Sequence, residues 1–197
     1  MTRQLEIPDP DQLYARFRSE PGPRWSARVT VGSLGDRLAD ATANVLTGHG
    51  RVLCVVILRG GALLYPSFSQ RLPNADFMML GLRREAGQVL CNYRTTIPQP
   101  HYDQLVYLDC VAATGSTILT ARAAIAEQCL FEQELAAVIC SSEPASAVLG
   151  NAGIGLVGFS LHEQVDAGIV SPDLGELDAG DLFSSALAEV AAQPLPR

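Results

Sequence analysis

The sequence predicts an α/β domain in which helices cover a parallel β-sheet. Short apolar runs typical of buried strands alternate along the chain with segments of helical periodicity, and this alternation is typical of parallel strands joined by helical crossovers. At 197 residues, 48% of them hydrophobic, the chain is long enough to bury one sizeable core and short for two full domains. We therefore expect a single domain over residues 1–197.

Each expected element follows from a local pattern. The apolar run VLCVVIL is the clearest strand, and the segment SLGDRLADATANVL shows a helical pattern with Ser33 as a candidate cap. Residues 1–30, rich in proline and charge, predict an irregular N-terminal segment. Five strands are expected, at 52–58, 76–82, 105–109, 135–140 and 155–161. Helices are expected near 33–47, 61–71, 117–128, 144–150 and 181–192.

The balance of charges disfavours two kinds of partner. Arginine and lysine number 14 against 21 aspartates and glutamates, and the net charge of −7 opposes non-specific binding to nucleic acid or to an anionic membrane surface. The first thirty residues contain no apolar signal segment, and the apolar run at 52–58 is far too short to cross a bilayer. We therefore expect a soluble cytoplasmic protein with no membrane partner.

The five cysteines predict neither a disulfide framework nor a zinc site. They stand singly, mostly in apolar stretches, with no C-x-x-C pair and no histidine-rich partner segment. We interpret them as reduced structural residues. They are Cys54, Cys91, Cys110, Cys129 and Cys140.

The segment LVYLDCVAATGSTILTAR at 105–122 is the strongest candidate for a binding site. A strand that stops at Asp109 and feeds a loop and a helix places that loop at the carboxyl edge of the sheet, where open α/β folds bind ligands. Free N–H groups at the helix start and the hydroxyls of 114–117 suit a phosphate. A carboxylate beside a phosphate site needs a polyol or a metal, so a sugar phosphate fits both halves. The same residues would also serve simply to end a strand and cap a helix.

This stretch resembles the phosphoribosyl-diphosphate loop of type I phosphoribosyltransferases, and it is most similar to that of the uracil phosphoribosyltransferase family. The family pattern D-P-M-L-A-T-G-G-S corresponds to DCVAATGST at 109–117, with the A-T-G core retained. The resemblance implies that Asp109 holds the ribose hydroxyls of the substrate. It also implies a 5′-phosphate site formed by Ala113, Thr114, Gly115, Ser116 and Thr117.

Two further segments resemble the diphosphate-binding parts of the same family, in the same order. VILRGGALL at 56–64 is similar to P-I-L-R-A-G-L, a loop that approaches the diphosphate with its backbone and an arginine, which implies this role for Arg59 and Gly60. MLGLRREAGQVLCNYRTTIP at 79–98 is similar to the family's mobile arm. That match places Arg84 on the diphosphate-binding arginine and Tyr93 on the tyrosine of the arm.

A third segment resembles the part of the family that binds the base. GIVSPDLGELDAGDLF at 168–183 is similar to Y-I-x-P-G-L-G-D-A-G-D-x-x-F, which implies that the base meets Asp178, Ala179, Gly180 and, on a facing strand, Val170. The chain departs from the pattern here, because Asp173 replaces a glycine and two extra residues follow at 176–177. Uracil is therefore one candidate acceptor, beside a modified pyrimidine or another nitrogen heterocycle.

The resemblance as a whole implies a phosphoribosyltransferase with a five-stranded parallel sheet, flanking helices, a projecting mobile arm at 83–98 and a small C-terminal hood at 160–183. It implies transfer of 5-phosphoribosyl from phosphoribosyl diphosphate to a nucleobase-like, pyrimidine-type acceptor with release of diphosphate. Mg²⁺ and the two arginines, Arg59 and Arg84, would neutralise the leaving diphosphate. Family members are usually homodimers or larger homo-oligomers, and we expect the same.

Alternative functions remain compatible with this sequence. A regulatory or RNA-binding module can use the same fold, although the net charge of −7 disfavours it. A specialised biosynthetic phosphoribosyltransferase would use an acceptor other than uracil. A dinucleotide-dependent oxidoreductase is disfavoured, because GIGLVG at 153–158 precedes a strand-like run instead of opening a helix.

Overall fold

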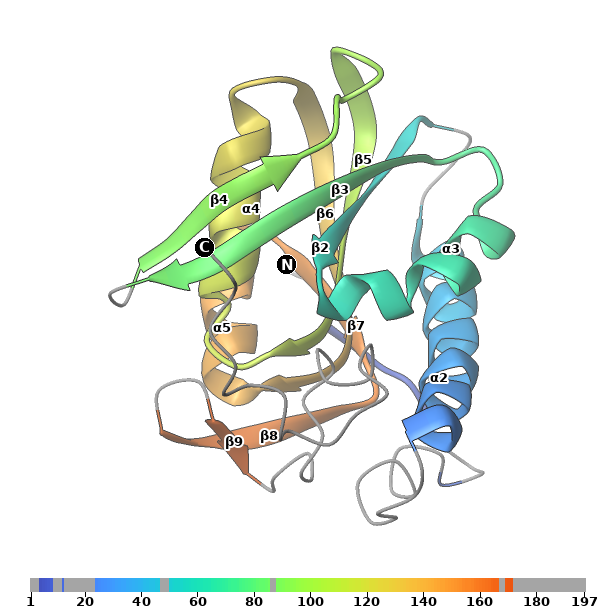
Figure 1. The fold of residues 1–197 in the computed structure, drawn as a ribbon, viewed down its shortest axis with the longest axis vertical. Helices are drawn as coiled ribbons and strands as arrows, with labels where there is room; N and C mark the ends of the chain where they lie inside the picture. Colours follow the sequence, from blue (N-terminus) through green and yellow to red (C-terminus); the bar gives the residue numbers. More distant parts are fainter. Residues whose placement is uncertain are drawn as a thin grey trace, which may run out of the picture.

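A sheet of parallel strands forms the centre of the protein (Figure 1). The computed structural model describes residues 4–8, 12, 24–46, 50–85, 88–166 and 169–171. Within these residues six parallel strands lie in the order β1, β7, β6, β5, β2, β3, and β4 pairs antiparallel with β3 at the edge. They are β1 Gln4–Glu6, β2 Val52–Leu58, β3 Asp76–Glu85, β4 Gln88–Arg94, β5 His101–Ala112, β6 Leu130–Ser142 and β7 Gly155–Gly158. The predicted α/β fold with a parallel sheet is confirmed, although the described residues form six parallel strands where five were expected, because β1 was not predicted.

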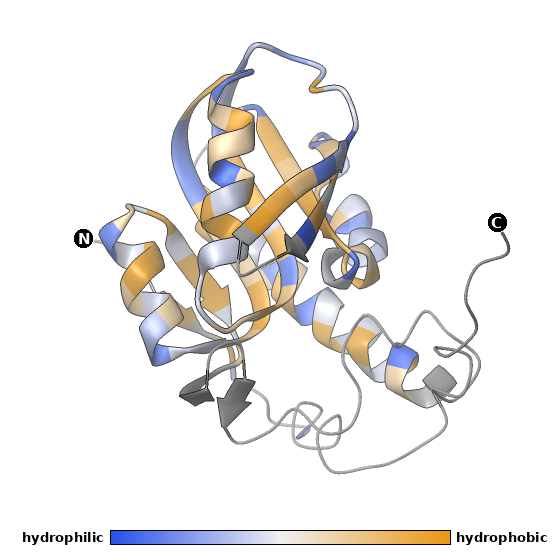
Figure 2. Ribbon diagram, turned by 60° about the vertical axis from the view of Figure 1, so that its left-hand side comes forward, coloured by the Kyte–Doolittle hydropathy of each residue, from blue (hydrophilic) through white to orange (hydrophobic). Residues whose placement is uncertain are grey.

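Helices cover both faces of the sheet, and this explains the continuous apolar runs within its central strands. One face is covered by α2 (Arg24–Val45) and α3 (Tyr65–Arg71), and the other by α4 (Ser116–Ala126) and α5 (Glu143–Asn151). Along β2 the side chains alternate between the two cores: Cys54 and Val56 face α2, whereas Val55 faces α4. Figure 2 shows the apolar strands enclosed by these helices.

The N-terminal part of the chain is more regular than the sequence predicts. The expectation of an irregular segment over residues 1–30 is wrong at 4–6 and 24–30, because β1 pairs with β7 and α2 begins at Arg24. Most of the remainder lies outside the described residues. The prolines of this region end at position 23, so nothing after them breaks a helix. Ser33 lies inside α2, where its hydroxyl donates to the Val29 carbonyl at 3.3 Å instead of capping the helix.

Strand β5 is longer than predicted at both ends. The prediction that it stops at Asp109 is wrong, since Val111 and Ala112 still pair with Cys140 and Ser141 of β6. Pairing of β5 with β2, its neighbour on the opposite side from β6, ends earlier, at Leu108. Asp109 therefore lies at the carboxyl edge of the sheet on the β2 side, although its strand continues beside β6.

The region expected as one strand at 155–161 is divided into two. Strand β7 ends at Gly158, and β8 (Ser160–Asp166) then runs parallel to the last residues of β6. Strand β9 (Ile169–Ser171) returns antiparallel to β8, and this hairpin is the described part of the predicted hood. The helix expected at 181–192 lies outside the described residues. The region expected as one helix at 61–71 consists of a 3₁₀ turn, η1 (Gly60–Leu63), followed by α3.

The predicted arm is a β-hairpin formed by the end of β3 and by β4. Residues 80–85 of β3 pair antiparallel with residues 88–94 of β4, with a shift of register after Gly81. The hairpin extends past the sheet and packs alongside α4 (Figure 1). Its mobility stays a prediction.

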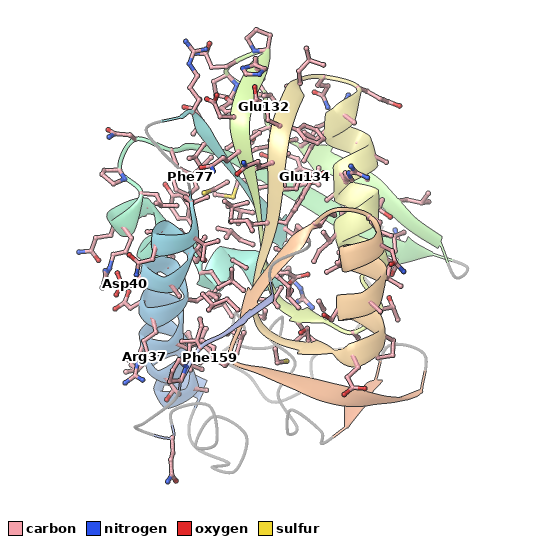
Figure 3. The ribbon with its side chains drawn as sticks, turned by 180° about the vertical axis from the view of Figure 1, so that it is seen from behind. Arg37, Asp40, Phe77, Glu132, Glu134 and Phe159 are labelled. Carbon is pink, nitrogen blue, oxygen red and sulfur yellow. The ribbon has the colours of Figure 1, made fainter. Side chains whose placement is uncertain are left out.

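A buried group of polar side chains joins α4 to the sheet. The Tyr107 hydroxyl of β5 donates to Glu134 of β6 at 2.7 Å, and Arg122 of α4 donates to the same carboxylate through Nε and Nη2 at 2.9 Å each. Figure 3 shows Glu134 on β6, on the side that carries α4. Because each carboxylate oxygen has a partner, the charge of Glu134 is tolerated at 6% side-chain exposure. Burial, and then the charge of Glu134, raise the pKa of Tyr107.

All five cysteines are free thiols, and Cys91 is the exposed member of the set. Burial raises the pKa of Cys54 to about 12, which keeps this thiol protonated and unreactive at neutral pH. None of the helices in the described part of the chain is long and apolar enough to span a membrane.

The buried Tyr107 hydroxyl predicts a loss of stability in alkali. An unfolded tyrosine ionises near pH 10.0, whereas burial beside Glu134 keeps folded Tyr107 protonated to higher pH. The protonated Tyr107 hydroxyl therefore contributes fully to the free energy of unfolding below about pH 10. Above that pH, the free energy of unfolding falls by up to about 1.4 kcal/mol per pH unit. We expect Tyr107→Phe to remove that part of the slope in urea unfolding measured from pH 7 to 11. Tyr65→Phe, which removes an exposed hydroxyl, is the control; a slope unchanged by Tyr107→Phe would contradict the expectation.

Candidate active site

Two loops meet at the carboxyl edge of the sheet. The loop after β2 carries Arg59 into η1, and the loop 113–115 joins β5 to α4. Since β2 and β5 are neighbouring parallel strands, their carboxyl ends lie side by side, and the side chains and backbone groups of the two loops face the same edge. This is the edge at which open α/β folds bind ligands.

The loop before α4 has the form of an anion site. Gly115 precedes the helix with φ of 74°, a left-handed conformation that favours glycine. The Thr114 hydroxyl lies 2.8 Å from the Ser116 hydroxyl and accepts a hydrogen bond from the Ser116 N–H at 3.3 Å. The loop borders a hollow of about 200 Å³, lined by Val111, Ala112, Ala113, Thr114, Gly115, Thr117 and Ile118. The helix start, the hydroxyls and the hollow together suit a phosphate group.

The loop after β2 lies directly against Asp109. A Cβ atom on Gly60 would be 2.5 Å from Asp109 Oδ1, so the absent side chain leaves the space that the carboxylate occupies. A Cβ on Gly61 would be 2.1 Å from the Leu108 carbonyl oxygen. The Cys110 thiol lies 3.3 Å from the Gly60 carbonyl, and the Cys110 N–H donates to Asp109 Oδ1 at 2.8 Å. The peptide bond Leu58–Arg59 is cis.

The predicted site residues therefore fall into two groups. Arg59, Gly60, Asp109 and residues 113–117 share the carboxyl edge, and the Arg59 side chain is exposed at the start of η1. Arg84 lies instead on the hairpin, where it pairs with Val89.

Tyr93 belongs to the hairpin group as well. It pairs with Gly81 in β4 and is 53% exposed. The two predicted hairpin residues thus come from an element that packs against α4. This helix directly follows the loop 113–115, which we call the phosphate-type loop.

The base-binding prediction is only partly within the described chain. Val170 lies in β9 and pairs with Gln164 of β8, and the first residues of β8 pair in parallel with the carboxyl end of β6. The hood hairpin therefore starts at the same edge as the phosphate-type loop. Asp178, Ala179 and Gly180 lie outside the described residues.

Two residues that matter for the geometry were not predicted from the sequence. Gly61 packs against the backbone of β5, whereas the sequence pattern implied only that the backbone of this loop approaches the diphosphate. Ser142 contacts the loop at Ala113 from the end of β6. The sequence feature that could have identified Ser142 is the pattern S-E-P, in which a serine precedes an acid and a proline at a helix start.

Solved structures with the same fold define the class. The AQ2163 protein from Aquifex aeolicus superposes with a TM-score of 0.79 at 18% identity, covering 94% of this chain and 99% of that one. The adenine phosphoribosyl transferase from Trypanosoma brucei superposes with a TM-score of 0.56 at 14% identity, covering 82% and 84%. The fold is that of the type I phosphoribosyltransferases.

The sequence comparisons are more specific. A profile described as uracil phosphoribosyltransferase matches residues 30–183. The chain is 30% identical over 170 residues to the chloroplastic uracil phosphoribosyltransferase of Arabidopsis thaliana. That match covers 82% of this chain and 56% of the relative, so the chain spans little more than half of the relative's length. The chain belongs to the uracil phosphoribosyltransferase family.

The close approach at Gly61 predicts a clear asymmetry between two glycines. Gly61→Ala places a Cβ 2.1 Å from a backbone oxygen that cannot rotate away, so we expect the free energy of unfolding to fall by about 1–3 kcal/mol. Gly32→Ala, in the middle of α2 with nothing within 4 Å of the added atom, should raise it by roughly 0.5–1 kcal/mol. Urea unfolding of both variants measures the difference. Wild-type stability in Gly61→Ala would show that the two backbones separate easily.

Proposed function

We propose that the protein transfers the 5-phosphoribosyl group from phosphoribosyl diphosphate to a nitrogen of a pyrimidine-type base and releases diphosphate. The observation that carries the proposal is the juxtaposition of Asp109 with two loops at one sheet edge, in a chain of the uracil phosphoribosyltransferase family. A carboxylate suited to a ribose diol, a helix start suited to a phosphate, and a loop with an exposed arginine correspond to the three parts of that substrate.

The chemistry requires positioning and charge neutralisation more than proton transfer. Displacement of diphosphate from C1 of the ribose develops oxocarbenium character, as glycoside cleavage does. In our proposal the loop 113–117 binds the 5′-phosphate and Asp109 binds the ribose hydroxyls. Arg59 and Arg84 stabilise the departing diphosphate, with the N–H of Gly60 beside them. The hairpin with Tyr93 would close over the leaving group and exclude water.

The residues present fit a magnesium ion that arrives on the substrate. Mg²⁺ prefers octahedral oxygen coordination and retains several waters, so substrate oxygens can supply most of its ligands. In the part of the chain that the structure describes, no three His, Cys, Asp or Glu residues gather into a metal-holding group, while Asp109 offers a carboxylate at the site. When bound, the ion would neutralise charge on the diphosphate.

The acceptor is the least constrained part of the proposal. The Arabidopsis relative is named for uracil and the Trypanosoma structure for adenine, so the fold serves both ring types. We propose that Val170, Asp178, Ala179 and Gly180 contact the base, and that the altered pattern at 173–177 shifts the preference toward a modified pyrimidine or another nitrogen heterocycle. A homodimer or larger homo-oligomer completes the proposal on the strength of family resemblance, and we also propose a cytoplasmic location.

A substrate panel tests this function. The protein is incubated with phosphoribosyl diphosphate, Mg²⁺ and a set of pyrimidines, purines and other nitrogen heterocycles, and the nucleotide products are identified by mass spectrometry. We expect one nucleoside monophosphate and an equal amount of diphosphate. Absence of any nucleotide product would contradict the proposed reaction, and a strong preference for uracil would contradict the proposed shift in acceptor.

The proposed contacts predict the effect of two substitutions on substrate binding. Asp109→Ala removes the acceptor for the ribose hydroxyls, and Thr114→Val removes a hydroxyl from the phosphate loop. Each should weaken binding of phosphoribosyl diphosphate by about 1–3 kcal/mol, measured by calorimetry with Mg²⁺ present. Asp103→Ala is the matched control, because Asp103 lies at the opposite end of β5, where it accepts from the Arg51 N–H at 2.6 Å. Unaltered binding in both site variants would show that the substrate lies elsewhere.

A further inference from the structure

Ser142 lies at the end of β6 and connects three parts of the structure. Its side chain is fully buried, with a relative exposure of 0%. Its hydroxyl donates to the Ala113 carbonyl and accepts a hydrogen bond from the Ala145 N–H at 3.0 Å. One hydroxyl therefore satisfies both the first residue of the phosphate-type loop and the first turn of α5, with its single proton committed to Ala113.

The bond to Ala113 fixes the direction of the next N–H group. In a trans peptide unit the carbonyl oxygen and the following N–H point in opposite directions. When Ser142 holds the Ala113 carbonyl on the side of β6 and α5, the Thr114 N–H is directed away from them. The hollow beside the loop is lined by Ala113 and Thr114, whereas Ser142 is buried and does not line it.

Helix α5, which Ser142 caps, also packs against the loop. A Cβ on Gly115 would be 3.4 Å from side-chain atoms of both Val148 and Leu149, so α5 packs against the backbone of the loop without a gap. Leu149 is fully buried, which limits how far this support can move. The loop is thus fixed at Ala113 by a hydrogen bond and at Gly115 by packing.

We propose that Ser142 is a positioning residue for the substrate's 5′-phosphate: it orients the backbone N–H groups of 113–115 without touching the ligand. The proposal rests on the proposed function, because that function puts the phosphate at this loop. A preorganised loop binds the phosphate equally in the ground state and the transition state, so its loss affects substrate affinity more than turnover.

The test compares Ser142→Ala with the wild-type protein in binding and in kinetics. We expect the Kd for ribose 5-phosphate, which carries the 5′-phosphate without the diphosphate, to rise about tenfold by calorimetry. The KM for phosphoribosyl diphosphate should rise by a similar factor, while kcat changes by less than about twofold. Ser142→Thr, which retains a hydroxyl, should restore most of the affinity.

Thr42→Val is the matched control for lost stability. Thr42 is fully buried in α2, and its hydroxyl donates to the Leu38 carbonyl at 2.7 Å, near the end of the helix that leads to the opposite edge of the sheet. We expect this variant to lose stability, as Ser142→Ala does, and to retain wild-type Kd and KM. The comparison separates a general loss of stability from a displaced loop.

Two outcomes would overturn the proposal. The first is a wild-type Kd for ribose 5-phosphate in Ser142→Ala, which would reduce Ser142 to a cap of α5. The second outcome applies if Ser142→Ala does not fold. Ser142→Cys then replaces the hydroxyl with a weaker donor, and a wild-type Kd for ribose 5-phosphate in that variant would also overturn the proposal. Absence of turnover in the wild-type protein would contradict the proposed function instead, and the ribose 5-phosphate titrations would still decide the role of Ser142.

Discussion

The candidate site depends on two stretches of backbone that lie closer together than any side chain would allow. The loop after β2 turns against the end of β5 at Gly60 and Gly61, and an added Cβ at either position would overlap an oxygen atom of β5. Because the loop has no side chain at these two positions, an exposed arginine and a strand-end carboxylate come together at one edge of the sheet. Charge neutralisation and diol recognition can then act on neighbouring atoms of one small ligand.

The rest of the fold holds the second loop in place from several directions. Helix α4, which begins at that loop, is fixed to the sheet in its middle by the ion pair between Arg122 and Glu134, with Tyr107 donating to the same carboxylate. At its start the loop rests on Ser142 and on α5. Such a site requires little reorganisation when a phosphate arrives, and preorganisation of this kind reduces the entropic cost of binding.

The sequence predicts those parts of the structure that leave a local pattern in the chain. Continuous apolar runs identify the central strands, since both faces of a parallel sheet are buried, and the A-T-G core identifies the loop before α4. The end of β5 could not be predicted, because Val111 and Ala112 suit a strand or a loop until their pairing with β6 is known. Short β1 has too few residues for a periodic signal, and the contact of Ser142 with Ala113 joins positions far apart in the chain.

Strand β1 has a consequence for how the protein reaches its native state. It covers the outer edge of β7, so that edge does not present unpaired backbone groups to other chains. Its partner, however, is among the last sheet strands to be synthesised. Residues 4–6 must therefore wait until β7 has been made before they can pair, and a contact of such long range slows folding. Until β1 docks, the exposed edge of β7 can pair with other newly made chains.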